Sequence, residues 1–209
     1  FELSGNHFTK GEEHFLPLYE AKMIHHYNHR FGDYTYLPEG SVSTKLPRVP
    51  LDRLQDPHYE PLPRYWVNIK EILQKLLNPG ILFGFRDITN VTNERTFISS
   101  AFPLSAVGNT LPLISSSKYD LLPLLLCNMN SFCCDYLIRQ KVGGTHMTYN
   151  YVKQFPVLTD NQYSAQLFQF IISRFIELSF TSYGMTTVSY THLRAHETVL
   201  DLVCRLLLE

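Results

Sequence analysis

ILFGFRDI at residues 81–88 and RTFISSAF at residues 95–102 are the stretches that decide the fold class. Both are rich in apolar, aromatic and β-branched residues, and the polar segment TNVTNE at 89–94 joins them. Two such runs on either side of a short polar link are typical of paired β-strands. We therefore predict two strands here, with residues 111–114 as a candidate third strand.

The strongest helical pattern follows, in KYDLLPLLLCNMNSFCCDYLIR at residues 118–139. Its apolar residues recur at helical spacing on one broad face, namely Leu122, Leu125, Leu126, Met129, Phe132, Cys133, Tyr136 and Leu137. Pro123 fits such a helix only near its first turn, and Gly143-Gly144 is expected to end it. A second helix is predicted over residues 162–178. Helices and strands thus mix in one unit, and we predict an α+β domain with a mixed sheet and flanking helices.

The remaining segments give weaker signals. Residues 1–14 are polar without a steady period and are interpreted as the end of a preceding loop or domain, whereas 15–19 predict a strand leading into a turn. Six prolines make 37–64 irregular. Residues 65–77 predict an amphipathic helix stopped by Asn78-Pro79-Gly80, and 145–157 are strand-like.

Composition sets broad limits on the function. The 209 residues are 44% hydrophobic and 18% charged, which is enough for a globular core. The longest apolar run, 121–127, is too short to cross a bilayer, and we expect no membrane association. We see no export signal, and adjacent Cys133 and Cys134 are poor disulfide partners. These features favour a cytoplasmic protein with reduced thiols.

Several clusters of polar residues are candidates for chemistry or binding. Glu20-Ala21-Lys22 matches half of a metal-dependent nuclease motif, but no aspartate precedes it. His25, His26 and His29 lie close enough in sequence to bind zinc if His25 and His29 share one face of a helix. A structural zinc site would also need cysteine or carboxylate ligands at set spacing, and the cysteines lie about a hundred residues away. We therefore assign no catalytic residue and no metal ligand, and an ordinary charged strand end or polar packing explains both patterns.

Basic residues gather in three places, although the net charge is −1 and DNA-binding domains usually carry a basic surplus. Any DNA affinity must therefore come from local clustering. Cations there would contact phosphates, and glycines would let the backbone approach one closely. Intramolecular ion pairs and a cation-capped helix end are the alternatives. The DNA-binding candidates are Lys22, His25, His26, Arg30, Arg86, Arg95, Arg139, Lys141, Gly143, Gly144 and Thr145.

Blocks over roughly residues 15–185 resemble, in order and spacing, the C-terminal target-recognition region of restriction-modification DNA adenine methyltransferases. This family includes enzymes that fuse methylation with cleavage, and the blocks also resemble the recognition domains of type I specificity subunits. The matching blocks are Pro17–His25, His29–Phe31, Pro63–Val67, Gly84–Thr89, Thr92–Thr96, Gly108–Leu113, Asn130–Phe132, Asp135–Tyr136, Arg139–His146, Gln154–Val157 and Glu177–Thr181.

The resemblance implies a module that selects a sequence in double-stranded DNA, while a missing N-terminal domain binds S-adenosylmethionine and methylates adenine. We find neither a glycine-rich cofactor loop nor an Asn/Asp-Pro-Pro-aromatic tetrapeptide here, so no cofactor is expected in this fragment. The alternatives are a stand-alone specificity subunit and a structural or protein-interaction domain. Residues 186–209 depart from the family and resemble a translated sequencing adapter, so His192, His196 and Cys204 are not interpreted as a site.

Overall fold

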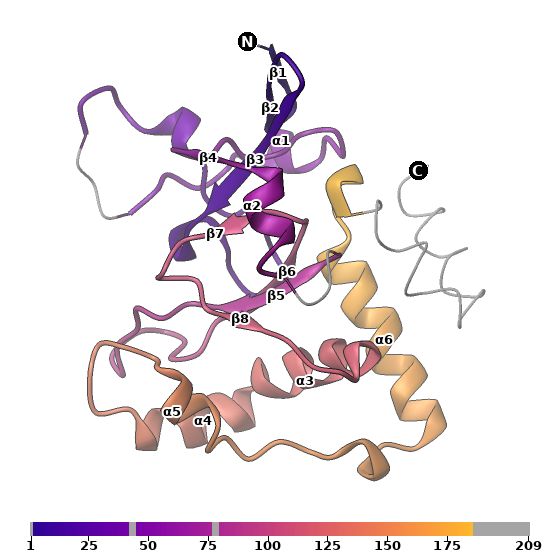
Figure 1. Cartoon of the computed structure of the whole chain (residues 1–209). Coiled ribbons are helices and arrows are strands. Elements are labelled where there is room, and N and C mark those ends of the chain that lie inside the picture. The colour runs from indigo at the N-terminus through magenta and orange to yellow at the C-terminus, as the bar shows by residue number, and fades with distance from the viewer. Residues whose placement is uncertain (1, 42–44, 77–79, 186–209) are drawn as a thin grey trace.

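The computed structural model describes residues 2–41, 45–76 and 80–185. Its strands form two sheets, with the longer helices against the lower one in Figure 1. Antiparallel and parallel pairs occur together in the first sheet, so the predicted α+β class with a mixed sheet is confirmed. The predicted helix stop at Asn78-Pro79 and the tail from residue 186 lie outside the described residues.

The first sheet is built on β3 (Glu13–Tyr19), which confirms the strand expected at 15–19. It pairs antiparallel with β2 (His7–Lys10) and β4 (Trp66–Asn68), and in parallel with β7 (Ala106–Val107). At the edge, β1 (Glu2–Ser4) pairs with β2.

The interpretation of residues 1–14 as a loop end is therefore wrong, because β1 and β2 form a hairpin continuous with β3. Gly5 and Gly11, at φ 60° and 62°, supply the left-handed backbone of the two tight turns. Each strand has only three or four residues and is largely exposed, so no alternation of apolar residues marks it.

The second sheet contains β5 (Leu82–Phe85), β6 (Ser99–Phe102) and β8 (Leu113–Ile114), in the order β6-β5-β8. All three strands were predicted. Both β5 and β6 are buried throughout because each face of this sheet is covered. Phe83 and Ala101 face the helices, whereas Leu82 and Phe102 pack with residues of the first sheet.

The predicted helix at 118–139 is divided in two, and this is a correction. After a single turn, η3 (Tyr119–Leu121), α3 (Leu122–Met129) ends before α4 (Phe132–Lys141), and the two parts are bent by 75°. Ser131 caps α4 by accepting a hydrogen bond from the Cys134 amide at 3.2 Å. Pro123 does lie at the start of α3, as expected.

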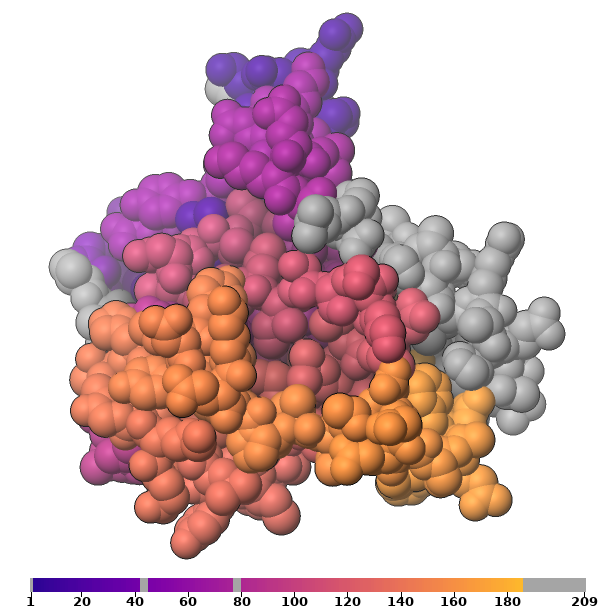
Figure 2. All heavy atoms as spheres, turned by 60° about the horizontal axis from the view of Figure 1, so that its bottom comes forward, coloured from indigo at the N-terminus to yellow at the C-terminus, as the bar shows by residue number. Residues whose placement is uncertain are grey.

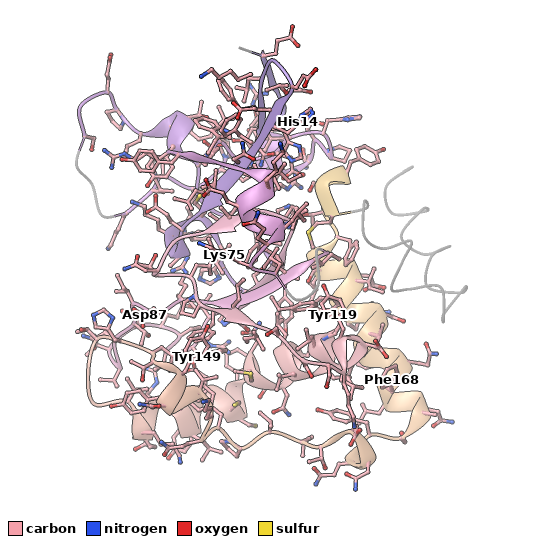
Figure 3. The ribbon with its side chains drawn as sticks, viewed as in Figure 1. His14, Lys75, Asp87, Tyr119, Tyr149 and Phe168 are labelled. Carbon is pink, nitrogen blue, oxygen red and sulfur yellow. The ribbon has the colours of Figure 1, made fainter. Side chains whose placement is uncertain are left out.

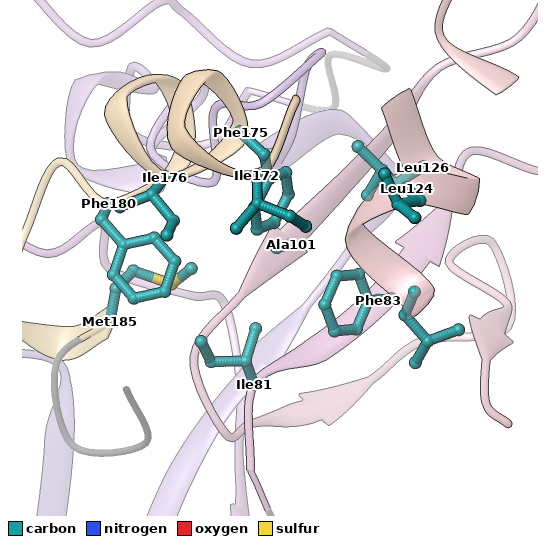
Figure 4. Packing of buried hydrophobic residues seen from close by; sticks show 11 residues of the cluster. Ile81, Phe83, Ala101, Leu124, Leu126, Ile172, Phe175, Ile176, Phe180 and Met185 are labelled. Atoms are coloured by element: carbon teal, nitrogen blue, oxygen red, sulfur yellow. The ribbon is translucent and has the colours of Figure 1, made fainter. Parts of the chain in front are cut away.

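The second predicted helix is present as α6 (Ala165–Ser179), with Ser164 as its N-cap. Its buried face packs on α3 and on the sheet, as Figure 4 shows around Phe83, Ala101 and Phe175. The Phe83 and Phe175 rings stack with centroids 6.1 Å apart. This cluster holds the helical layer against β5 and β6.

Two local predictions fail. The strand-like segment 145–157 contains a short helix, α5 (Tyr149–Val152), and the helix expected at 65–77 is reduced to α2 (Ile69–Leu73) after β4. η2 (Tyr34–Tyr36) lies directly before the proline-rich segment. The described part of that segment is mostly irregular and holds one helical turn, α1 (Leu51–Leu54). Further 3-10 turns are η1 (Ala21–Met23), η4 (Asp160–Gln162) and η5 (Tyr183–Met185).

Within the described ranges, no single helix has the length and hydropathy needed to cross a membrane. The segments Tyr119–Met129 and Phe132–Lys141 reach that threshold only when taken together across their 75° bend.

Candidate nucleic-acid interface

The first basic segment is held in a tight turn after η1. The backbone amides and carbonyls of His25 and Asn28 bond to each other at 2.8 and 3.1 Å, and Tyr27 between them has a φ of 56°. The Asn28 side chain accepts a hydrogen bond from the Arg30 amide at 2.8 Å. This closed turn sends His25 and His26 in one direction and His29 and Arg30 in another.

Arg30 does not lie on the surface, which corrects its place among the DNA-contact candidates. Its side chain is 0% exposed and donates to the carbonyls of Leu54, Asp56, Tyr59 and Thr181 at 2.5–3.0 Å. The guanidinium thus joins the α1 region to the chain after α6. Because the whole side chain is buried, it cannot reach DNA in this conformation, and its role is structural.

His29, which was considered as a zinc ligand, is also buried. Its Nε2 lies 3.0 Å from the Ser182 hydroxyl and 3.5 Å from a Glu60 carboxylate oxygen. Although these three residue types occur in hydrolases, His29 and Ser182 are both 0% exposed, so no substrate reaches them. Among the described residues, no three His, Cys, Asp or Glu side chains are grouped to hold a metal ion.

Lys22 lies in η1 and is half-buried. Its Nζ is 3.4 Å from the Glu20 carboxylate and 5.0 Å from the centre of the Tyr34 ring. Lys22 therefore forms an ion pair with Glu20, two positions earlier in the chain, and is not a free cation. Glu20 directly follows the end of β3, as the interpretation of a charged strand end expects.

His25 and His26 lie together beside Arg86, at the end of β5. The two imidazole centroids are 5.1 Å apart, and His26 Nε2 is 2.9 Å from the Phe97 carbonyl. Arg86 donates through Nε and Nη2 to the Ile24 carbonyl, with Nε at 2.9 Å. Loss of solvent around this group lowers the pKa of Arg86 to about 10.

Burial and the neighbouring cations shift the two histidines in the same direction. Burial is the largest cause that lowers the pKa of His25 to about 4, followed by Arg86, His26, Arg48 and Arg95. The pKa of His26 is also lowered, mainly by burial, although the Phe97 carbonyl opposes this. At neutral pH both imidazoles are uncharged and lie in a positive potential.

Arg95 and Arg139 meet at one buried carboxylate. Asp135 Oδ2 is 3.1 Å from Arg139 Nη2, and Oδ1 is 3.7 Å from Arg95 Nε. Asp135 Oδ1 also accepts the amides of Thr96 and Phe97 at 2.8 and 2.9 Å. These bonds, with burial opposing them, lower the pKa of Asp135. The ion-pair alternative therefore holds for Arg95, and Arg139, in the last turn of α4, shares the same carboxylate.

Arg139 also fixes the polar link between the strands. It donates to the carbonyls of Val91, Asn93 and Glu94, the last two at 2.9 and 3.0 Å. Helix α4 thereby sets the conformation of the turn that connects β5 to β6. Arg139 is partly exposed, so its guanidinium lies at the edge of the surface.

Lys141, Gly143, Gly144 and Thr145 are exposed in the chain after α4. This chain runs beside the link, because the Thr145 carbonyl accepts the Thr89 amide at 3.0 Å and the Asp87 carbonyl accepts the Met147 amide at 2.6 Å. In Figure 3, Asp87 and Tyr149 mark this end of the molecule, far from His14. Figure 2 shows α4 and the chain after it at the lower left of the face.

The structure thus sorts the candidates into three groups. The first group is linked through shared neighbours and consists of His25, His26, Arg86, Arg95 and Arg139. The second group lies on the adjoining surface and consists of Lys141, Gly143, Gly144 and Thr145. Lys22 is paired and Arg30 is buried.

Arg48 and Phe31 belong to the first group, although sequence reasoning missed them as site residues. The Arg48 guanidinium lies 5.2 Å from the centre of the Phe31 ring. Arg48 occurs in the proline-rich stretch, where no periodic pattern draws attention to it.

Comparison with models of known families, with curated proteins and with solved structures finds no match.

Proposed function

We propose that this chain is a DNA sequence-recognition module of a site-specific DNA adenine-N6 methyltransferase of a restriction-modification system. The observation that carries the proposal is an excess of cations along one surface. Arg48, Arg86 and Arg95 lie around the two histidines, and Arg139 joins Arg95 at Asp135, which accepts all the ion pairs of these arginines within the described residues.

Such a surplus favours a polyanionic partner. Arg48 and Arg86 have no carboxylate partner among the described residues, and phosphate groups would relieve the repulsion between such cations and release counterions on binding. A chain with a net charge of −1 can bind DNA in this way because the local potential, not the total charge, determines the contact.

The surface beside the cations has the features expected of base readout. The link at 89–94 and the chain at 143–146 lie side by side, and they expose amide, hydroxyl and imidazole groups together with the Glu94 carboxylate. The His146 imidazole is paired with the Asp87 carboxylate at 2.7 Å. Phosphate contacts would set the position of the module, and polar groups on this surface would contact base edges.

The methyl transfer itself is assigned to a domain outside this chain. The resemblance described above implies that S-adenosylmethionine binds there, together with the groups that hold a flipped adenine. This chain alone is therefore expected to bind duplex DNA without methylating it. Methyl transfer by the purified chain with S-adenosylmethionine and DNA would contradict this division.

The test is binding to fluorescent duplex DNA, measured by anisotropy across salt concentrations. We expect the affinity to fall steeply with salt, and Arg48→Ala and Lys141→Ala each to weaken binding to all sequences and lower the salt slope by about one. Both side chains are exposed, so folding should be unaffected. Lys118→Ala is the matched control, since this lysine pairs with Asp160 elsewhere on the surface. Binding that is absent at low salt would overturn the proposal.

A protein-interaction domain is a second candidate, favoured by the outer face of α4. Phe132 and Tyr136, one turn apart, are 80% and 65% exposed, and Leu137 lies next to them. Apolar side chains grouped on a surface often contact another protein, as a stand-alone specificity subunit would require. Tyr136→Ser with Leu137→Ser should leave DNA affinity unchanged if α4 contacts a protein, whereas lost DNA affinity would place this face on the duplex. Phe132 is kept in this variant because the Arg95 guanidinium carbon lies 4.5 Å from its ring centre.

A further inference from the structure

The Phe31 ring is surrounded by three basic side chains. The guanidinium carbons of Arg48 and Arg86 lie 5.2 and 5.4 Å from the ring centre, and the His25 ring centroid is 4.7 Å away at a tilt of 31°. These residues come from the turn after η1, from the end of β5 and from the segment that precedes α1. The tertiary structure, not the sequence order, brings them together.

These groups retain hydrogen-bond donors that the protein does not use. Arg86 donates both Nε–H and Nη2–H to one acceptor, the carbonyl of Ile24. Within the described ranges, neither Arg86 nor Arg48 forms an ion pair with a carboxylate. The His25 imidazole has no hydrogen bond to a described residue, and its contacts are with the rings of His26 and Phe31. Guanidinium and imidazole groups are the usual donors to phosphate oxygens.

The charged groups that face His25 are all basic. They are Arg86 directly after β5, Arg48 from the segment before α1, Arg95 directly after the link at 89–94, and the adjacent His26. Asp135 acts on His26, and its carboxylate is occupied by Arg95, Arg139 and two amides. The largest charge effects on His25 therefore all oppose its protonation.

We propose that Arg48, Arg86 and His25 form a site for one phosphate-type oxyanion, and that His25 takes up a proton from solvent when the anion binds. The inference rests on the proposed function in that the anion would be a phosphodiester of DNA. The same site would take free sulfate or phosphate, because the recognised chemistry is a tetrahedral oxyanion.

The proton uptake follows from the electrostatics of the site. In the free protein, burial and the cations keep the His25 pKa at about 4, so the imidazole is neutral at pH 7. A bound anion cancels part of that potential and accepts an N–H bond from the ring, and both effects raise the pKa. If the bound pKa returns to about 6.5, affinity should increase about tenfold between pH 7.5 and pH 5.5.

The first experiment measures the His25 pKa by NMR of the imidazole C–H signals, assigned with His25→Gln. Sulfate is the probe because it does not titrate in this range, and sodium chloride at equal ionic strength is the control for screening. We expect sulfate to raise the pKa of His25 saturably in the wild type but not in Arg48→Ala, while exposed His14 shows no saturable shift. Equal pKa values in sulfate and chloride would overturn the site.

The second experiment measures DNA affinity from pH 5.5 to 7.5 at fixed salt. Wild type and His14→Gln should show the increase towards low pH, and His25→Gln should lose it. An unchanged slope in His25→Gln would refute proton uptake by this residue. DNA binding without a sulfate effect would refute the oxyanion site and leave the proposed function intact. A sulfate effect without DNA binding would refute the proposed function and leave the oxyanion site intact.

Discussion

Replacing Asp135 tests whether one carboxylate joins α4 to the strand link. Asp135 accepts two buried amides, from Thr96 and Phe97, and lies within 3.7 Å of two guanidinium groups. In Asp135→Ala both amides lose their partner, at about 1–3 kcal/mol each, and the arginines lose their counter-charge. These losses overlap, and we expect the free energy of unfolding to fall by about 3–5 kcal/mol.

The assay is urea unfolding followed by the fluorescence of Trp66, the single tryptophan, and by far-UV circular dichroism. Asp135→Asn should lose less than the alanine variant, because its amide oxygen can still accept both backbone amides. Asp160→Asn is the matched control, since it removes a carboxylate from an exposed pair with Lys118 and should change little. If Asp135→Ala were as stable as this control, the network would contribute nothing and our account of the link would be refuted.

Three further outcomes are expected. Phe175→Ala should lower the free energy of unfolding, measured in urea, by about 3–5 kcal/mol because the ring is buried between α6 and β5. Phe170 is 60% exposed on the same helix, so Phe170→Ala should lower it far less, and similar losses in the two variants would contradict the packing of α6. Ser131→Ala should cost about 1 kcal/mol through loss of the α4 cap, and an unchanged urea midpoint would argue against the break between α3 and α4. His25→Gln should reduce the acid sensitivity of folding: its folded pKa of about 4 lies below the unfolded value, so its contribution is complete above about pH 6.5 and is lost as pH falls towards 4. Thermal melts from pH 7 to pH 4 that run parallel in variant and wild type would contradict this sign.

The candidate site shows which functional inferences local sequence permits. The basic composition of 22–30 and 139–141 is visible in the chain, and so is the glycine pair that follows α4. Whether a given cation is free is not visible, because its partner can lie anywhere in the sequence. Arg30 donates to Thr181, 151 positions away, whereas Arg48 was overlooked and lies at Phe31.

The sequence by itself determined the elements whose apolar residues repeat at a regular local spacing. Strands β5 and β6 and helix α6 follow from apolar runs and 3.6-residue spacing, because each carries enough apolar residues to require a covered face.

Tertiary contacts decided the rest. Helical spacing continues across Asn130 and Ser131, yet the Asn130 side chain bonds to the backbone of Ser99, 31 positions away, and the chain turns there to begin α4. The β1–β2 hairpin likewise exists because β3 offers an edge, not because its exposed residues alternate. A polar side chain forms its hydrogen bonds with whatever group the fold brings near, and only the folded chain determines which groups those are.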